Sequence, residues 1–310
     1  MTSKKISKKS SYLKKKHSLN IPSLIPHVIS YNLSWATQDN IESGTERRFV
    51  KWCNKNKKKW KKRDYYKFPN WCTQSALDGL RQHIDKYPVE FILFQEPTFS
   101  NFKDSHIVLD YLNINQNNLD IVNGEQDDIF ISILYNKKYY KKIISFSGDI
   151  EDGRPYLIVK FKDIIKNKNI IVASVHMPHN KFLNDNTQYL VNEMMTLKDK
   201  NTIRLIMGGD FNGVPTILPK QFNNINNDLL YLPKTCCWQG GRGYGDLIYD
   251  TNQEYNELKI IPEFDINGYI GFIKNGSYIP KDKYIGSDHL PVFLMPNISK
   301  KIKSYKKTKY

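Results

Sequence analysis

Short apolar runs dominate the pattern of hydrophobic and polar positions along this chain. Most are four to seven residues of Ile, Val, Phe, Tyr and Leu. Runs of this length and composition predict strands buried on both faces, as in packed sheets. The predicted strands cover residues 27–33, 89–95, 129–135, 143–146, 156–161, 170–176, 203–208, 247–249, 258–261, 269–272 and 290–295.

Two longer segments carry apolar residues at helical spacing. The first runs from about Thr73, which can cap it, to Lys86, and the second runs from about Asn186 to Lys198. We interpret the apolar stripe of each segment as a helix face packed on the core. The stripes are Ala76, Leu77, Leu80 and Ile84 in the first helix and Tyr189, Leu190, Met194 and Leu197 in the second.

Strands and helices in irregular order predict an α+β fold of packed sheets in one domain. No internal repeat and no Pro/Gly/Ser-rich linker divides the 310 residues. We place the domain at residues 24–298, between basic tails at 1–23 and 299–310. A basic stretch at about 46–68 falls between the first strand and the first helix, where we expect a long surface insertion.

The net charge of +16 is confined to three segments. Residues 1–20 carry seven Lys, residues 300–310 carry six, and residues 54–67 carry seven Lys and Arg63 against Asp64. Because these segments hold more positive charge than the whole chain, the rest of the chain is mildly acidic. One interpretation is that they bind the phosphate backbone of nucleic acid. The other is that Lys-rich ends reflect composition and keep the chain in solution.

The sequence gives no support to the membrane-spanning and secreted classes of protein. The longest apolar runs, such as 91–94 and 170–175, are far shorter than the roughly 20 residues of a membrane span. The first 25 residues lack the apolar stretch of a secretory signal. Four cysteines are too few and too irregularly spaced for a disulfide scaffold or a zinc site. We therefore expect free thiols in an intracellular, reducing compartment.

Candidate site residues stand at the ends of predicted strands, where a sheet can hold polar groups in fixed geometry. Asn32 ends the first strand, Gln95 and Glu96 end the second, and His176 ends a later one. A carboxylate that follows an apolar strand is well placed to hold a metal. Each of these residues alone is also consistent with an ordinary strand terminus or a hydrogen-bonded structural histidine.

Two segments are more informative, Gly-Gly-Asp-Phe-Asn at 208–212 and Ser-Asp-His at 287–289. Asp210 and Asn212 share one side of an extended chain, because residues two apart point the same way. This pair offers a charged acceptor and an amide donor for a phosphoryl oxygen, although the same residues also form ordinary turns. Asp246 opens a further strand and could orient a histidine.

Taken in order, these residues resemble the successive motifs of the endonuclease/exonuclease/phosphatase superfamily. The resemblance covers about residues 26–296, and its most specific parts are Gly-Asp-Phe-Asn at 209–212 and Ser-Asp-His at 287–289. It implies a four-layer α/β/β/α sandwich of two mixed, largely antiparallel sheets flanked by helices. It also implies hydrolysis of a phosphoester by in-line attack of water, with Mg²⁺ as cofactor and Mn²⁺ as a substitute.

The resemblance implies a set of metal ligands that contains only oxygen donors. Glu96 is the principal Mg²⁺ ligand, Asn32 supports it, and Asp288 belongs to the same carboxylate cluster. Few carboxylates and several waters suit a small hard ion.

The resemblance also implies the catalytic roles. Asp210 orients and deprotonates the attacking water, and Asn212 holds a non-bridging oxygen. His289 donates a hydrogen bond or a proton to the phosphoryl group, and Asp246 keeps its imidazole oriented and cationic. His176 is a second phosphate contact.

Two departures bear on the substrate. Some repair nucleases of the superfamily carry an acid where this chain has Ser34, and tyrosine where it has His176. The resemblance therefore favours the branches that include pancreatic-type deoxyribonucleases, tyrosyl-DNA phosphodiesterases, deadenylases and sphingomyelinases. We expect a phosphodiester in nucleic acid as substrate. The alternatives are a phosphatase or phospholipase C-like enzyme on inositol phosphates or sphingomyelin, with the basic segments on anionic membrane, and an inactive binding scaffold.

The basic tails provide a test of nucleic-acid binding. If they contact phosphates, a chain of residues 21–299 should bind nucleic acid more weakly than the full chain. The slope of log K against log salt should then fall by about 0.7–0.9 for each lost contact. Turnover of a short soluble diester should stay the same. Binding measured on both chains from low to moderate salt gives the slopes, and equal slopes would show that the tails are solvated ends.

Overall fold

The fold is taken from a computed structural model. The described residues are 27–33, 71–97, 105–113, 117–126, 129–179, 182–217, 219–222, 245–252, 255–260, 287, 289 and 291–296. The basic tails, the insertion at 46–68 and the predicted strand at 269–272 lie outside the described residues.

The first sheet contains six of the described strands. They are β1 (His27–Asn32), β2 (Val89–Gln95), β3 (Leu119–Gln126), β4 (Ile129–Asn136), β10 (Tyr255–Ile260) and β11 (Val292–Pro296). Their order across the sheet is β10-β11-β1-β2-β4-β3. The central pair β1 and β2 is parallel, with Asn32 opposite Gln95, and the other pairs are antiparallel.

The second sheet contains the other five described strands. They are β5 (Tyr140–Asp149), β6 (Pro155–Asp163), β7 (Lys168–His176), β8 (Thr202–Asp210) and β9 (Asp246–Asp250), in that order across the sheet. The pair β7 and β8 is parallel, with His176 opposite Asp210. Since β9 runs antiparallel to β8, its first residue, Asp246, also lies opposite Asp210.

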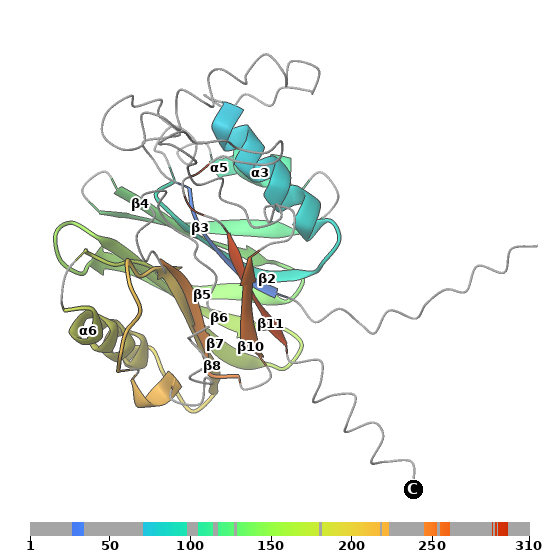
Figure 1. The fold of residues 1–310 in the computed structure, drawn as a ribbon. Helices are drawn as coiled ribbons and strands as arrows, with labels where there is room; N and C mark the ends of the chain where they lie inside the picture. Colours follow the sequence, from blue (N-terminus) through green and yellow to red (C-terminus); the bar gives the residue numbers. More distant parts are fainter. Residues whose placement is uncertain are drawn as a thin grey trace, which may run out of the picture.

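Helices cover the outer faces of both sheets (Figure 1). On the first sheet lie α3 (Trp71–Ile84) and α5 (Ser105–Leu112), whose apolar residues, such as Leu80 and Leu112, belong to one buried cluster with Ile92. On the second sheet lies α6 (Leu183–Thr196), whose Leu190 and Met194 share a cluster with strand residues. A short 3-10 helix, η2 (Lys220–Phe222), joins the same cluster through Phe222.

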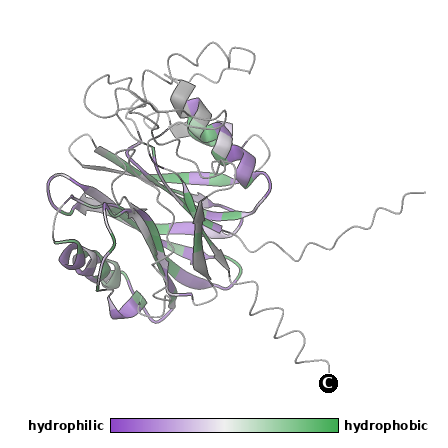
Figure 2. Cartoon of the chain, viewed as in Figure 1, coloured by the Kyte–Doolittle hydropathy of each residue, from purple (hydrophilic) through white to green (hydrophobic). Residues whose placement is uncertain are grey.

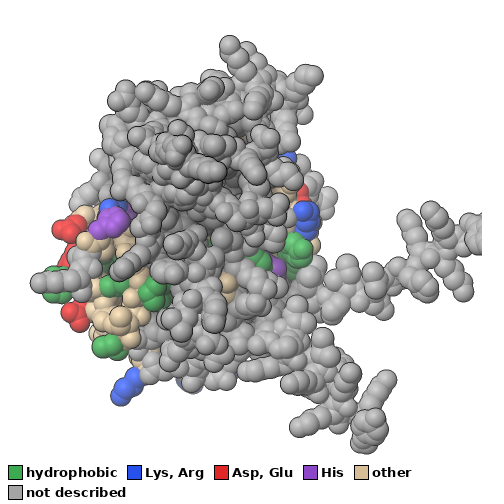
Figure 3. All heavy atoms as spheres, in the orientation of Figure 1, with side chains coloured by type: hydrophobic (Ala, Val, Ile, Leu, Met, Phe, Trp, Pro, Cys, Tyr) green, Lys and Arg blue, Asp and Glu red, His purple; other side chains and the backbone are tan. Residues whose placement is uncertain are grey.

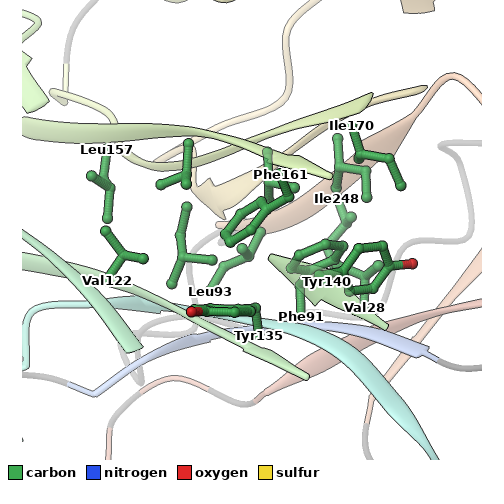
Figure 4. Packing of buried hydrophobic residues seen from close by; sticks show 14 of the residues in the cluster. Val28, Phe91, Leu93, Val122, Tyr135, Tyr140, Leu157, Phe161, Ile170 and Ile248 are labelled. Atoms are coloured by element: carbon green, nitrogen blue, oxygen red, sulfur yellow. The ribbon is translucent and has the colours of Figure 1, made fainter. Parts of the chain in front are cut away.

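A third apolar cluster fills the space between the two sheets. In Figure 4, side chains such as Phe91 and Leu93 on β2 point toward Leu157 and Phe161 on β6. The Phe91 and Phe161 ring centroids are 5.2 Å apart. Burial of this kind is the dominant favourable term in folding. The order of layers is therefore helix, sheet, sheet, helix, and the α+β sandwich predicted from the sequence is confirmed.

Two elements were missed by the apolar pattern. The helix α5 is only eight residues long, too short to show a helical period clearly. The strand β3 lies at the edge of its sheet and mixes polar residues with apolar ones in Leu-Asp-Ile-Val-Asn-Gly-Glu-Gln. Edge strands bury less surface than central ones, so their sequence pattern is weaker. For the same reason the edge strand β5 extends three residues beyond the predicted 143–146 at each end.

The surface pattern agrees with these layers. Figure 2 shows hydrophobic residues along the strands. The helices α3 and α6 carry both hydrophobic and hydrophilic residues. On the face shown in Figure 3, the described charged side chains of both signs are scattered. No helix among the described residues has the length and apolar character needed to cross a membrane.

Two glycines let β8 lie close to its neighbours just before Asp210. A Cβ added at Gly208 would lie 2.7 Å from Leu93 Cδ1, on the facing sheet. A Cβ at Gly209 would overlap the backbone carbonyl oxygen of Val175 on β7, which cannot move without breaking the strand pairing. Glycine at position 209 is therefore required for the parallel pair to bring His176 opposite Asp210.

We expect Gly209→Ala to lower the free energy of unfolding by about 2–3 kcal/mol, because the new methyl group overpacks a fixed backbone contact. Gly153→Ala is the matched control: Gly153 has φ +68 with no atom within 4 Å of an added Cβ, so only backbone strain of about 1 kcal/mol applies. Urea unfolding of both variants measures the difference. Equal losses would mean that the close approach at Gly209 is unimportant.

Candidate active site

The predicted site residues meet at one rim of the sandwich. Asn32 ends β1 and Glu96 follows β2, while His176 and Asp210 end β7 and β8. Because each sheet has a parallel pair at this point, the carboxyl ends of four strands reach the same rim. The Asn32 amide donates a hydrogen bond of 3.0 Å to Asp210 Oδ2, which joins the two sheets directly.

Asp210 lies between two histidines. Its Oδ2 atom is 3.7 Å from His289 Nε2 and 3.8 Å from His176 Nε2. The other ring nitrogen of His289, Nδ1, lies 3.0 Å from Asp246 Oδ2. A carboxylate only accepts hydrogen bonds, so Nδ1 is the donor and Nε2 is turned toward Asp210. The structure thus forms an Asp246–His289–Asp210 series in which Asp246 orients the imidazole.

Glu96, His176 and Arg154 form the second half of the site. Glu96 Oε1 lies 3.3 Å from His176 Nε2 and 3.8 Å from Arg154 Nη1. Arg154 Nη1 also lies 2.7 Å from His176 Nε2. The side chains of Glu96 and Arg154 are 15% and 24% exposed, whereas those of His176 and Asp210 are each 2% exposed. Solvent therefore reaches the site on the side of Glu96 and Arg154.

Four hydrogen bonds hold the segments that carry these groups in place. The Asn212 backbone N–H donates to Asp210 Oδ1 at 2.9 Å, and the Asn212 side-chain amide donates to the Met177 carbonyl at 2.6 Å. Ser287 donates to the Asn32 carbonyl at 2.7 Å, and the His289 N–H donates to Ser287 Oγ at 3.1 Å. The loops after β8 and before β11 are thereby tied to the ends of β7 and β1.

The Gln95 side chain links the two sheets just below the site. Its buried side chain donates to Ser174 Oγ at 3.0 Å and accepts from Ser30 Oγ at 3.3 Å. Since Ser174 belongs to the facing sheet, this chain of hydrogen bonds fixes β2 against β7 one layer below the rim. Glu96, the next residue, has φ +52 and leaves the strand direction toward Arg154.

The electrostatics favour an ionised Asp210 and a neutral His176. Burial acts to raise the pKa of Asp210, but the imidazoles of His289 and His176 and the hydrogen bonds from Asn212 and Asn32 lower it below its ordinary value. Burial lowers the pKa of His176 to about 3, and Arg154 and His289 add to this effect while Asp210 opposes it. Near neutral pH, Asp210 is therefore ready to accept a proton.

The donors at the rim suit a hard divalent cation. Glu96 and Asp210 supply carboxylate oxygens, Asn32 supplies an amide, and no thiolate is among the described groups at the rim. The described residues contain no group of three or more His, Cys, Asp or Glu side chains arranged to hold a metal. Mg²⁺ is commonly held by one or two carboxylates with several waters, and the oxygen donors of Glu96 and Asn32 are of this kind.

One predicted site residue is not described by the structure, and one residue at the rim was not predicted. Asp288, predicted to lie near the metal, is outside the described residues, as is Ser34. Arg154 was not predicted, because it lies in the β5–β6 turn, where its N–H donates to the Glu151 carbonyl, and no strand ends at it. The sequence feature that could have pointed to Arg154 is its residue type, because most basic residues of this chain are lysines.

Comparison with known proteins identifies the fold. No protein-family model and no curated protein matches the sequence. Among solved structures, the chain is similar to the mannosyl-6-phosphatase Bt3783 of Bacteroides thetaiotaomicron, with a TM-score of 0.57 and 13% identity over 88% of this chain and 100% of that one. It is also similar to an endonuclease/exonuclease/phosphatase from Bacteroides vulgatus, with a TM-score of 0.53 and 14% identity over 88% and 99%.

A third similar structure is humanized D. rerio TDP2, with a TM-score of 0.53 and 14% identity over 87% of this chain and 97% of that one. At such low identity, these similarities establish the fold. The chain therefore has the endonuclease/exonuclease/phosphatase fold, and the resemblance seen in the motifs is confirmed at that level. Each of the three chains is covered almost completely, so the chain spans the whole of this fold.

The position of Arg154 can be tested without an activity assay. Replacing Arg154 with Gln removes a positive charge near His176, so the pKa of His176 should rise from about 3. It should remain below the ordinary value of 6.5, because burial is the largest cause of the shift. An NMR titration of the imidazole measures both values. Arg81→Gln is the control, since Arg81 lies over the Tyr111 ring on the helical layer, and an unchanged pKa in Arg154→Gln would contradict the geometry.

Proposed function

We propose that this chain is a metal-dependent phosphoester hydrolase and that the rim around Asp210 is its active site. The observation that carries this proposal is the environment of Asp210. Burial acts to raise the pKa of this carboxylate, yet the His289 imidazole, the Asn32 amide and the Asn212 backbone N–H lower it. An ionised carboxylate can accept a proton from water, which is how a general base activates water for attack.

The substrate phosphoryl group binds between the two halves of the site. The Arg154 guanidinium and the His289 imidazole face this space and donate to the non-bridging oxygens. The Asn212 amide has a second hydrogen besides the one it donates to Met177, and we assign it to the same group of oxygens. These donors meet negative charge that increases in the transition state, where stabilisation raises the rate.

Asp210 accepts the proton of the attacking water. Its Oδ1 atom is held by the Asn212 N–H and its Oδ2 atom by the Asn32 amide, so the carboxylate cannot rotate away. As the water oxygen bonds to phosphorus, the bond to the leaving oxygen breaks and one water proton passes to Asp210. His289, oriented by Asp246 at 3.0 Å, stabilises the phosphoryl charge and is positioned to return a proton.

Glu96 and Asn32, with Asp288 as a further candidate, would hold the divalent cation. A bound Mg²⁺ would polarise the phosphoryl oxygens and neutralise charge on the leaving group. Glu96 Oε1 lies 3.8 Å from Arg154 Nη1 and 3.3 Å from His176 Nε2, which supports a role for this carboxylate within the same site.

For the substrate class, we propose a phosphodiester in nucleic acid. Support comes from the Lys-rich segments at 1–20, 54–67 and 300–310, which can supply phosphate contacts outside the site. A phosphate monoester of a sugar or inositol, or a lipid headgroup, is the second candidate, favoured by the similarity to a mannosyl-6-phosphatase. Turnover of DNA, RNA, 5′-tyrosyl DNA, sugar and inositol phosphates and sphingomyelin, each with Mg²⁺ and with excess EDTA, distinguishes the candidates. Full activity in EDTA would contradict the metal-dependent reaction.

We expect Asp210→Asn and His289→Ala each to lower kcat by at least about 10²-fold, the usual scale for loss of a general base or a charge-stabilising group. Asp185→Asn, an exposed change on α6, is the matched control and should leave kcat unchanged. Thermal unfolding of each variant separates loss of chemistry from loss of fold. A folded Asp210→Asn variant with nearly normal kcat would show that Asp210 is not the base.

A further inference from the structure

The end of the second sheet opposite the active site carries exposed isoleucines. Ile164 and Ile165 form the turn between β6 and β7 at this end and are 51% and 74% exposed, and Ile143 and Ile144, nearer the middle of β5, are both 49% exposed. These four residues make up half of the large hydrophobic side chains exposed in the described part of the chain. Single exposed apolar residues are ordinary, whereas two adjacent exposed pairs on the neighbouring strands β5 and β6 and the turn after β6 point to an interaction surface.

Lysines line a cavity that also includes Ile143. This cavity of about 500 Å³ lies beside the β6–β7 turn and is lined by Lys160, Lys162, Lys166, Lys168 and Ile143. The one carboxylate that lines it, Asp199, is paired with Lys160 at 2.7 Å. Among the described residues, neither Lys162 nor Lys168 pairs with a carboxylate, so the cavity has a net positive charge.

The turn that presents the isoleucines is held in place by the protein. The buried Asp163 carboxylate accepts from the N–H groups of Ile165 and Lys166 at 3.0 and 2.9 Å. The Ile164 N–H donates to the Tyr139 carbonyl at 2.8 Å. The two side chains are therefore exposed on a hydrogen-bonded turn whose backbone fixes their direction.

We propose that this surface binds an anionic lipid bilayer. The isoleucines enter the interfacial region, and the lysines contact the lipid phosphates, one of which fits the cavity. The surface, named here the Ile/Lys surface, consists of Ile143, Ile144, Ile164, Ile165, Lys160, Lys162, Lys166 and Lys168.

Charge and side-chain type favour a bilayer over the other occupants. A second copy of the chain would bring two lysine-rich surfaces together, and these repel each other in a symmetric contact. Single-stranded nucleic acid would neutralise the lysines, but its bases stack on aromatic side chains, and the cavity lining contains none. Only a bilayer pairs an anionic layer with an apolar one, which matches lysine beside isoleucine.

The orientation has a consequence for catalysis. The strand β6 begins next to Arg154 and ends at the turn that carries Ile164 and Ile165, and its nine residues span roughly 30 Å at the usual rise per residue. The active site therefore lies at the other end of β6 from the two isoleucines of this turn. Membrane binding positions the protein and leaves the site open to a soluble substrate.

Vesicle sedimentation tests the surface in the full chain. We expect binding to vesicles of phosphatidylcholine with phosphatidylserine, and little binding to phosphatidylcholine alone. The Ile164→Asn/Ile165→Asn variant keeps all charges but should bind at least about tenfold more weakly. Lys162→Gln/Lys168→Gln should weaken binding by about fivefold for each lysine. The controls are Ile217→Asn, since Ile217 is 69% exposed in the loop after β8, and Lys220→Gln on η2.

A fluorescence measurement separates this surface from the basic tails. In an Ile165→Trp variant, brominated lipids should quench emission more than they do in the wild-type chain, because only an inserted side chain meets the acyl region. Unchanged vesicle binding of Ile164→Asn/Ile165→Asn, or no added quenching, would overturn the proposal. The proposal would also be overturned if Ile164→Asn/Ile165→Asn lost nucleic-acid binding or self-association while its vesicle binding stayed intact. None of these readouts depends on hydrolysis.

Discussion

Parallel pairing of strands at the centre of each sheet determines where the polar groups of this protein lie. In a parallel pair the carboxyl ends of both strands reach the same edge, so β1 and β2 bring Asn32 and Glu96 together, and β7 and β8 bring His176 and Asp210 together. The apolar cluster between the sheets then places the two edges face to face. The antiparallel neighbour β9 adds Asp246 from its amino end. The site follows from strand direction and packing together.

A second buried polar network differs from the group of polar residues at the rim. At the other end of the same strands, Arg204 donates to Asp250 at 2.9 Å and to Glu90 at 2.7 Å. The side chains of all three are at most 8% exposed, and the single guanidinium donates to both carboxylates. Such a network holds strands together but offers no place for a ligand. At the rim, Glu96 and Arg154 remain partly open to solvent, so their charged groups are accessible from outside the protein.

The sequence predicted those parts of the molecule that repeat a strong pattern. Buried central strands are apolar along their whole length, so β2 was predicted with its observed ends, and His176 and Asp210 close β7 and β8 as the pattern predicted. The edge strand β3 and the short helix α5 lack such a pattern. Arg154 reaches the site from a turn, and only tertiary packing shows that a residue of the β5–β6 turn lies 2.7 Å from His176. Sequence spacing carries no information about that contact.

The central claim is that the converging strand ends form a cation site at Glu96. Titration with Mn²⁺ followed by electron paramagnetic resonance measures this directly, with Mg²⁺ as competitor. The account predicts that the wild-type chain binds Mn²⁺, that Mg²⁺ displaces it, and that Glu96→Gln weakens binding by at least about tenfold because a hard cation loses its charged oxygen ligand. Glu193→Gln on α6 should bind as the wild type does. Equal Mn²⁺ affinity in Glu96→Gln and the wild-type chain would contradict the account.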